Sequence, residues 1–345
     1  MLKAILLICA LLSCGMMTSC AGEKELPKPI WTSKPGEPET PEDQGSEKPE
    51  IKMITPTIEL AEKDADVAGL QYYPGMQINV KSEDFFNTRL NEVADAGFKY
   101  LELKFKYSYG FEKKTDDEIR RTFAEMQKKI KDKGLTVWSI HLPYENKTWT
   151  NIGGAENIRK QSVEYILRVL DLLHEGFPEC KNFVLHASKG VLSPRSESVA
   201  QARKSLGEML PTAKKYGVRL CVENLVGSLC PTPAEKGAVL DGIENVYSTF
   251  DIGHANCTGH DVADFLAWEG TRLGTVHIHD TMFGTNEDTH MLVGKGNIKK
   301  WGEVYRTLLT VNRYRGVFMF EPSDSQSAKD VMATYQIILD AYKKL

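Results

Sequence analysis

The sequence predicts an α/β fold, a closed (β/α)8 or TIM barrel, preceded by a signal peptide and a disordered Pro/Glu-rich linker. After residue 68, short runs of β-forming residues alternate strictly with longer amphipathic segments, eight of each, as a barrel of strand–helix units requires. An open doubly wound sheet is the alternative. No glycine-rich phosphate loop follows the first strand, where such sheets usually place one, and we therefore favour the barrel.

The predicted elements follow one another through residues 76–343. The strands are expected at 76–80, 100–104, 136–141, 182–186, 219–223, 247–251, 275–279 and 316–321. The helices are expected at 84–96, 117–133, 157–175, 196–216, 233–243, 261–271, 298–311 and 326–343. Residues 163–173 show the helical period most clearly, because their Val, Ile and Leu residues recur three and four positions apart, as in a helix that packs against a sheet.

The composition is that of a globular protein with a sizeable core. The chain has 345 residues, of which 41% are apolar and 26% are charged, and this length allows one large domain or two ordinary ones. Its formal net charge is −4. Because binding to nucleic acid depends on clustered Lys and Arg, we expect no nucleic-acid partner.

The first residues predict export from the cytoplasm. A short start with Lys3 precedes an apolar run over 4–12, which is typical of a secretory signal and too short for a spanning helix. The run 17–20, ending in Cys20, resembles the bacterial lipobox, in which the cysteine becomes the lipidated first residue. Cys14 is a competing match, and an ordinary cleaved signal is the alternative. We expect a lipid-anchored protein outside the cytoplasm, in the periplasm or at the cell surface of a bacterium.

Three segments follow from these patterns: a lipoprotein signal peptide at 1–20, a flexible linker at 21–67 and the barrel at 68–345. Residues 24–54 are rich in Pro, Glu, Lys, Ser and Gly and cannot bury enough apolar surface to order themselves. Four cysteines remain in the barrel segment at spacings that match no zinc ribbon, and we predict no disulfide.

Residues that can bind metals recur at or just beyond the ends of the predicted strands. A soluble core tolerates a buried imidazole or carboxylate only when it is paired or coordinates an ion, so this repetition indicates a polar centre. In a barrel, the C-terminal ends of the strands form the catalytic face. The residues are His141, His186, Glu223, Asp251, His254, His277, Asp288, His290 and Glu321.

Four of these residues come from the last four strands and can share one ion. Side chains alternate along a strand, and this period places Glu223, Asp251, His277 and Glu321 on the inward face of their strands. The set is rich in oxygen and suits Mn, Mg, Co or Zn with positions left open for a substrate. The sequence therefore predicts a divalent metal cofactor.

Successive short motifs resemble those of the xylose isomerase-like barrel superfamily. That superfamily includes sugar isomerases and epimerases, inosose-metabolising enzymes and apurinic-site endonucleases of the endonuclease IV type. The resemblance covers the chain from about residue 76 to the C-terminus. The motifs are Glu223-Asn224, Asp251-Ile252-Gly253-His254, His277-Ile278-His279-Asp280, Asp288-Thr289-His290 and Phe320-Glu321-Pro322.

The resemblance implies an activity and roles for individual residues. Its central metal site falls on Glu223, Asp251, His277 and Glu321, with His279 as the alternative imidazole. Glu223 and Glu321 are then the catalytic bases, which exchange a proton next to a carbonyl through a metal-stabilised enediolate. We therefore predict a metal-dependent sugar isomerase or epimerase whose partner is a small carbohydrate. A keto-sugar lyase or hydratase with the same site is the closest alternative.

The remaining candidates are expected to bind substrate or a second metal. They are His141, His186, His254, His279, Asp288, His290, Glu102 and Lys104. The alternatives are hydrogen-bonded barrel histidines and, for Glu102 and Lys104, a charged pair that neutralises itself.

The same positions match the further ligands of trinuclear zinc endonucleases. The predicted export, the acidic charge and Thr289, where the repair enzymes carry an arginine, disfavour that activity. A lipid-anchored carbohydrate-binding protein without turnover also remains open, although such a protein needs no pair of bases at one ion.

Overall fold

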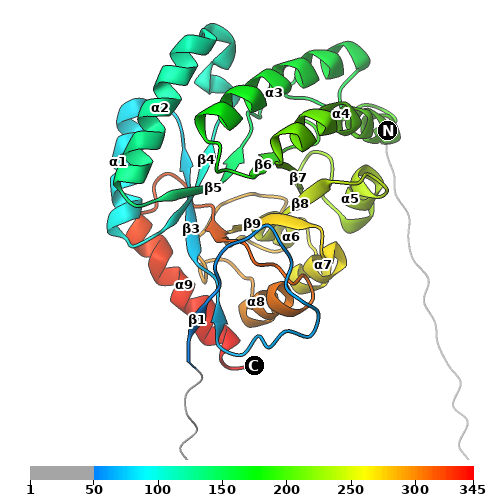
Figure 1. Cartoon of the computed structure of the whole chain (residues 1–345). Helices are drawn as coiled ribbons and strands as arrows, with labels where there is room; N and C mark the ends of the chain where they lie inside the picture. Colours follow the sequence, from blue (N-terminus) through cyan, green and yellow to red (C-terminus); the bar gives the residue numbers. More distant parts are fainter. Residues whose placement is uncertain (1–49) are drawn as a thin grey trace, which may run out of the picture. The chain divides into compact units, whose positions relative to one another are not determined.

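The structure, a computed structural model, describes residues 50–345. Within them, eight parallel strands form a closed barrel in the order β10-β3-β4-β5-β6-β7-β8-β9 (Figure 1), so the predicted (β/α)8 fold is confirmed. The predicted signal peptide, Cys20 and the linker as far as residue 49 lie outside the described residues. The strands are β3 (Pro74–Asn79), β4 (Tyr100–Lys104), β5 (Thr136–His141), β6 (Asn182–Leu185), β7 (Arg219–Glu223), β8 (Val246–Asp251), β9 (Leu273–Ile278) and β10 (Phe318–Phe320).

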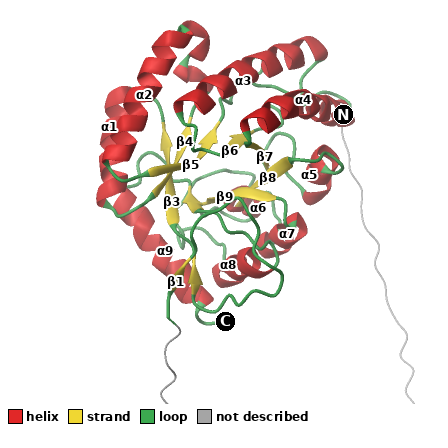
Figure 2. Ribbon diagram, viewed as in Figure 1, coloured by secondary structure: helices red, strands yellow, loops and turns green. Residues whose placement is uncertain are grey.

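Helices surround the strands on the outside of the barrel (Figure 2). Their apolar faces and the outward side chains of the strands form the main core. They are α1 (Glu83–Asp95), α2 (Asp116–Asp132), α3 (Glu156–Gly176), α4 (Arg195–Tyr216), α5 (Pro233–Leu240), α6 (Ile252–Cys257), α7 (Val262–Glu269), α8 (Trp301–Thr310) and α9 (Ala328–Tyr342). In the described part of the chain, no helix is both long enough and apolar enough to cross a membrane.

Local sequence signals set where several helices begin. Thr115 forms a capping box with Glu118 at the start of α2, and Ser82 and Ser327 cap α1 and α9 with their side chains. These caps satisfy backbone N–H groups that the first turn of a helix leaves without partners. The helix α6 has no counterpart among the predicted elements. It begins directly after β8 because the side chain of Asp251 accepts a hydrogen bond from the backbone N–H of His254, at 2.6 Å.

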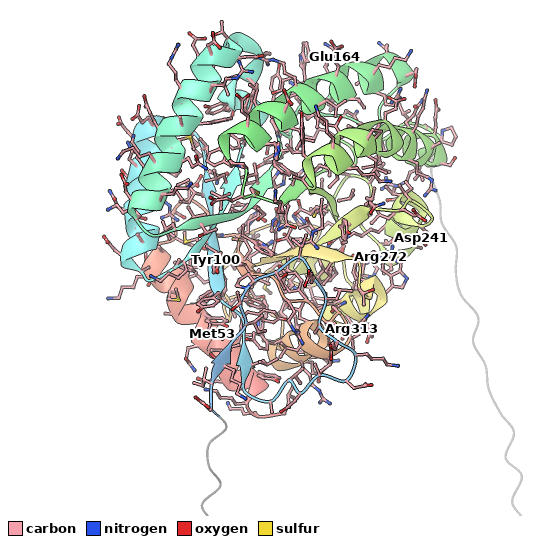
Figure 3. All side chains as sticks on the ribbon, viewed as in Figure 1. Met53, Tyr100, Glu164, Asp241, Arg272 and Arg313 are labelled. Carbon is pink, nitrogen blue, oxygen red and sulfur yellow. The ribbon has the colours of Figure 1, made fainter. Side chains whose placement is uncertain are left out.

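The segment 50–67 crosses the end of the barrel where the strands begin. Its strand β1 (Lys52–Met53) pairs in parallel with β2 (Leu70–Gln71), and the backbone N–H of Ala61 donates to the carbonyl of Arg313. Figure 3 labels Met53 and Arg313 at this end. These residues belong to the same compact unit as the barrel, so the part of the chain that packs with the barrel begins before the predicted boundary at residue 68.

Polar side chains fill the barrel interior at the opposite end. Gln77, Glu102, Ser139, Glu223 and Thr249 are all buried and point inward from neighbouring strands. Two of them bond to Glu102: Nε2 of Gln77 at 2.7 Å and Oγ of Ser139 at 2.6 Å. The four cysteines of the described residues are buried and free.

Candidate metal centre

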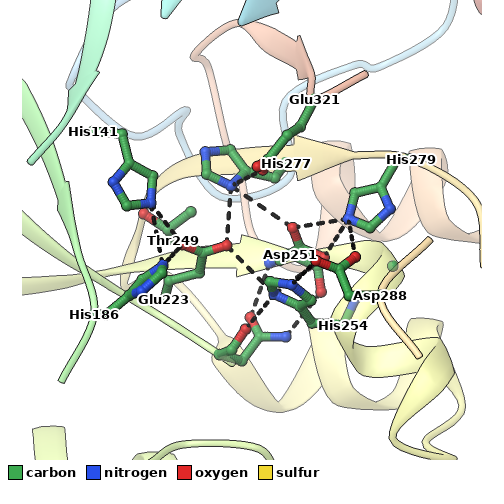
Figure 4. Close-up of polar contacts among 12 residues, drawn as sticks. His141, His186, Glu223, Thr249, Asp251, His254, His277, His279, Asp288 and Glu321 are labelled. Atoms are coloured by element: carbon green, nitrogen blue, oxygen red, sulfur yellow. Dashed lines mark hydrogen bonds and ion pairs between the residues drawn. The ribbon is translucent and has the colours of Figure 1, made fainter. Parts of the chain in front are cut away.

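The four residues predicted to share one ion converge at the C-terminal end of the barrel (Figure 4). Glu223, Asp251 and His277 lie on β7, β8 and β9, and Glu321 directly follows β10. One ligand atom from each lies within 4.8 Å of the other three, and all four residues are buried. The structure thus brings together side chains that are separated by as many as 98 positions in the sequence (321 − 223).

The imidazole of His277 faces this group with one nitrogen. Its Nδ1 lies 3.1 Å from Oε1 of Glu223, 3.7 Å from Oδ2 of Asp251 and 2.7 Å from Oε2 of Glu321. Its Nε2 lies 3.0 Å from Oε1 of Glu102 on the other side. Because Nε2 can donate its proton to Glu102, Nδ1 is left to face three carboxylates with its lone pair.

This donor set fits a divalent cation. Three carboxylates in one buried site repel one another unless positive charge lies between them. Oε2 of Glu321 is buried and accepts no hydrogen bond from the described residues, although Nδ1 of His277 is only 2.7 Å away. Without a cation, protonated His277 supplies the positive charge. Burial lowers the pKa of His277, but Glu102, Glu321 and Glu223 outweigh burial and raise this pKa well above its ordinary value.

A second group of donors adjoins Glu223. Nε2 of His141 lies 3.2 Å and Nε2 of His186 lies 3.0 Å from Oε2 of Glu223. Nδ1 of His141 donates to the carbonyl of Leu142 at 2.9 Å, so its Nε2 carries a free lone pair. Burial lowers the pKa of His186 to about 4 despite the neighbouring Glu223. His186 is thus neutral at physiological pH, and both imidazoles direct Nε2 at the carboxylate, as metal ligands do.

A third group centres on Asp288. Its Oδ2 lies 3.1 Å from Nε2 of His254 and 2.9 Å from Nε2 of His290. The Nδ1 atoms of these two histidines donate to backbone carbonyls, of Asn224 at 2.8 Å and of Glu321 at 2.9 Å. His254 and His290 are therefore oriented as His141 is: Nδ1 donates to a backbone carbonyl and Nε2 faces a carboxylate.

His279 lies between the first group and the third. Its Nε2 lies 3.0 Å from Oδ1 of Asp251 and 3.8 Å from Oδ1 of Asp288. Its ring packs directly on Gly253, where an added Cβ would lie 2.0 Å from the ring. Of the two imidazoles left open by the sequence, His277 contacts Glu223 and Glu321, whereas His279 contacts the neighbouring donors.

Glu102 and Lys104 do not pair with each other, contrary to the self-neutralising alternative. Glu102 contacts His277, and Nζ of Lys104 forms a buried ion pair with Oε1 of Glu321. Burial disfavours the charged ammonium, but Glu321 reverses this effect, and the pKa of Lys104 lies well above its usual value. Each residue therefore supports one member of the first group.

Sequence reasoning missed two further residues of the site. The side-chain oxygen of Asn224 accepts from the backbone N–H of Asp251, and its amide donates to the carbonyl of Asp251, both at 2.8 Å. The ring of Tyr144 lies beside His141 and His186, and Nζ of Lys104 is 5.1 Å from its centroid. Asn224 could have been predicted from the sequence, because it follows Glu223 directly. Tyr144 is on a loop, and no pattern in the sequence marks it.

A cavity of about 600 Å³ opens above the first group. Glu223, Glu321, His186, His254 and Asp288 contribute to its floor, and the loops that follow the strands form its walls. The cavity is large enough for a small carbohydrate. Two buried carboxylates that face one point at its floor can exchange a proton with a substrate carbon held between them.

The fold and the site define a (β/α)8 barrel with a candidate metal centre at the C-terminal ends of its strands. Residues 90–341 match the family model described as xylose isomerase-like TIM barrel. The chain therefore belongs to that family.

Two curated relatives share part of the sequence. An uncharacterized protein of Methanocaldococcus jannaschii is 27% identical over 214 residues, which span 58% of this chain and 70% of that protein. A protein of Acholeplasma laidlawii named probable endonuclease 4 is 25% identical over 189 residues, which span 49% of this chain and 62% of that protein.

Solved structures share the fold. A D-tagatose 3-epimerase-like protein superposes with a TM-score of 0.63 at 22% identity, over 78% of this chain and 97% of that one. A D-psicose 3-epimerase determined in the presence of D-fructose superposes with a TM-score of 0.61 at 18% identity, over 78% of this chain and 99% of that one.

Proposed function

We propose that the protein is a divalent-metal-dependent sugar isomerase or epimerase. One observation carries the proposal: Glu223 at the end of β7 and Glu321 directly after β10 both reach Nδ1 of His277, at 3.1 and 2.7 Å, at the floor of the cavity. The names of the structural neighbours, two of which are ketose 3-epimerases or resemble one, support a carbohydrate substrate.

In the proposed reaction the two carboxylates exchange one proton of the substrate. One of them removes a proton from the carbon next to a carbonyl, and the other returns a proton to the opposite face of that carbon. Burial raises the pKa of Glu223, but His277, His141 and His186 outweigh this effect and hold it well below its usual value. Lys104 and His277 do the same for Glu321. Both carboxylates are therefore ionised at neutral pH and able to accept a proton.

Other residues would hold the ion and the reacting groups in place. Glu223, Asp251, His277 and Glu321 would hold a divalent cation, which supplies Lewis acidity that polarises the carbonyl and stabilises the enediolate left by proton removal. Glu102 orients His277, and Asn224 fixes the backbone of Asp251. Burial of the carboxylates excludes water, which strengthens their interactions with the substrate.

Hydrogen exchange with solvent tests the proposal. The full-length protein, loaded with Mn2+ or Zn2+, is incubated in deuterated water with a panel of free and oxidised sugars, and deuterium incorporation is followed by NMR. We expect incorporation at one carbon of at least one sugar, abolished by a chelator and by Glu321→Gln. Absence of metal-dependent exchange with every sugar in the panel would contradict the proposal. Retained tight sugar binding in Glu321→Gln, with no exchange in either protein, would instead indicate a carbohydrate-binding protein.

A second candidate function is a three-metal endonuclease that cleaves DNA at abasic sites. The groups around Glu223 and Asp288 favour it, because they add two donor sets to the first one, and one relative carries the name probable endonuclease 4. The net charge of −4 disfavours binding to a polyanion. Incubation with an oligonucleotide that contains one abasic site decides between the two, since only the endonuclease cleaves it.

The same centre could also serve elimination. If the carbon next to the deprotonated position carries a leaving group, loss of that group gives a lyase or hydratase instead of an epimerase. Product analysis by mass spectrometry distinguishes the two, because elimination of water lowers the substrate mass and epimerisation leaves it unchanged.

A further inference from the structure

Lysines occupy one wall of the cavity above the candidate metal centre. We define this basic wall as Lys104, Lys106, Lys147 and Lys189, all of which line the cavity. They come from the ends of β4, β5 and β6 and the loops that follow them, and these three strands are neighbours in the barrel. Positive charge is therefore gathered on one side of the opening, although the protein as a whole carries a net charge of −4.

Two of these lysines have no acidic partner within residues 50–345. Lys104 pairs with Glu321, and Lys106 lies 3.4 Å from Glu145. By contrast, no carboxylate among residues 50–345 lies within 4.0 Å of the ammonium groups of Lys147 and Lys189. Asp324, which also lines the cavity, is engaged by Lys81 and by Asn79.

The two free lysines lie on loops that are in contact. Lys147 is exposed and Lys189 is half-buried. Cε of Lys147 lies 3.9 Å from the position that a Cβ on Gly190 would occupy, so its chain reaches across to the residue next to Lys189. The loop that carries Lys189 is fixed, because the backbone N–H of Lys189 donates to Oδ1 of the buried Asn151 at 3.3 Å. The two ammonium groups are thus carried by loops in contact, and an anion that lies between them would be attracted by both.

Among residues 50–345, the rest of the cavity lining contains no further lysine and no arginine. The loop after β7, next to the loop of Lys189, contributes the uncharged residues Leu225, Val226, Gly227 and Ser228, and the loops after β9 and β10, across the barrel, contribute Asp288 and Asp324. A substrate that bears one anionic group would therefore bind in a single orientation. Its charged end would face Lys147 and Lys189, and its carbonyl end would face Glu223 and Glu321.

We propose that Lys147 and Lys189 form an anion subsite, and that the substrate is a carbohydrate with a carboxylate or phosphate group. This inference rests on the proposed function, because it takes the metal centre as the reacting end of the same cavity. It deepens that function by selecting acidic sugars, such as uronates or sugar phosphates, over neutral ones.

Paired ligands test the inference. Binding to the metal-loaded full-length protein is measured by calorimetry for D-glucuronate against D-glucose, D-galacturonate against D-galactose, and D-glucose 6-phosphate against D-glucose. We expect at least one acidic member to bind roughly tenfold more tightly than its neutral partner, with a preference that shrinks as ionic strength rises. The uronate and phosphate arms show which anionic group the subsite takes.

Variants locate the effect. Lys147→Gln/Lys189→Gln should abolish most of the roughly tenfold preference, mainly by weakening binding of the acidic member of each pair. Lys99→Gln/Lys133→Gln, which removes two exposed lysines that precede β4 and β5 at the other end of the barrel, should keep the preference. Equal binding of acidic and neutral members in every pair, or a preference that survives Lys147→Gln/Lys189→Gln, overturns the inference.

The two proposals fail in different ways. Deuterium exchange on neutral sugars only, unaffected by Lys147→Gln/Lys189→Gln, would leave the isomerase proposal standing and refute the anion subsite. Lysine-dependent binding of acidic sugars without any exchange would support the subsite and contradict the isomerase. Lysine-dependent cleavage of abasic DNA, with no sugar preference, would overturn both.

Discussion

Nε2 of His277 lies 3.0 Å from Oε1 of Glu102, and this contact decides which ring nitrogen faces the candidate metal centre. With its proton directed to Glu102, the ring presents Nδ1 to Glu223, Asp251 and Glu321. Glu102 also accepts from Gln77 and Ser139, so its position is fixed before any ion binds.

Glu102→Gln should weaken metal binding without unfolding the protein. A glutamine can direct its amide N–H groups at Nε2 and so favour the wrong tautomer of His277, and loss of such a supporting carboxylate typically lowers metal affinity by about 10–100-fold. Competition with a fluorescent chelator measures the change. Glu125→Gln, at an exposed position on α2, is the matched control and should keep the wild-type affinity. Unchanged affinity in Glu102→Gln would remove the role assigned to this contact.

The three donor groups predict three divalent ions per chain. Elemental analysis of the purified protein and anomalous scattering from crystals count and place them. His141→Ala/His186→Ala should lower the count by one, because it removes two of the three donors in the group that contains Glu223. His254→Ala/His290→Ala should do the same at Asp288. A single ion in the wild-type protein would show that the outer groups serve hydrogen bonding or substrate binding instead.

Metal-free protein should lose stability as the pH rises above about 6.5. The pKa of His277 is raised well above its ordinary value of 6.5 in the folded protein, and so is that of His254. A histidine whose pKa is higher in the folded than in the unfolded protein stabilises the fold fully at any pH below its unfolded-state pKa. This stabilisation is lost as the pH rises through its folded-state pKa. We therefore expect the Tm of chelator-treated protein to fall over this range.

A saturating divalent ion should abolish that fall, because the cation takes the place of the bound protons. Melting curves between pH 6 and pH 9, with and without the ion, measure the difference. His260→Asn removes an imidazole outside the three groups and should leave the difference between the metal-free and metal-loaded proteins unchanged. The same pH dependence in both forms of the wild-type protein would contradict the assignment of these histidines.

The buried ion pair between Lys236 and Glu269 should matter for stability far more than a surface pair. Both side chains are fully buried, with Nζ and Oε1 2.6 Å apart, and Nζ also donates to the carbonyl of Thr249 at 2.9 Å. Lys236→Met leaves the buried carboxylate of Glu269 with only Arg272, whose Nε is 3.9 Å away, as a partner, and should cost about 3–5 kcal/mol of the free energy of unfolding.

Urea denaturation of metal-loaded protein measures this loss. Lys236→Met/Glu269→Leu should recover most of it, since an apolar pair can replace a buried ion pair. Lys300→Met breaks the exposed pair with Asp261 and should cost less than about 1 kcal/mol. If Lys236→Met costs no more than Lys300→Met, the buried pair does not stabilise the fold as expected.

Cys20, which lies outside the described residues, is predicted to carry the lipid. Cys20→Ser should release the protein from the membrane fraction and abolish labelling with a radioactive fatty acid, whereas Cys14→Ser should change neither. If Cys14→Ser abolishes the labelling and Cys20→Ser does not, the lipid is attached to Cys14. Equal solubility of all three proteins would indicate an ordinary cleaved signal.

The sequence predicted the barrel well because its signals are local. Alternation of strands and helices depends on short-range periodicity, which each segment carries by itself. The helix α6 escaped this reasoning, because its six residues are too few to show an amphipathic period. Trp138 illustrates another limit: the register between β4 and β5 shifts at Leu101/Glu102, and Trp138 packs with Val317 and Met319 in a small cluster apart from the main core.

The candidate site was predictable to the extent that strands carry it. Alternation along β7, β8 and β9 places Glu223, Asp251 and His277 inward, and this part needed no structure. Asp288 and His290 lie instead on the loop 280–298, whose shape depends on Asp280 accepting from the backbone N–H groups of Gly294 and Ile298. The partners of Glu102 and Lys104 were not predictable either, because the sequence does not show which side chains from strands far along the chain point toward these two residues inside the barrel.

The segment 50–67 covers one end of the barrel and leaves the other end open to ligands. It lies across the end at which the strands begin, whereas the cavity with the metal-binding residues opens at the other end. A partner protein fused ahead of residue 50 should therefore leave ligand entry unhindered, while a fusion joined to the loop after β6 should block it. Immobilisation through the N-terminal side is accordingly the orientation of choice for surface-based binding measurements on this molecule.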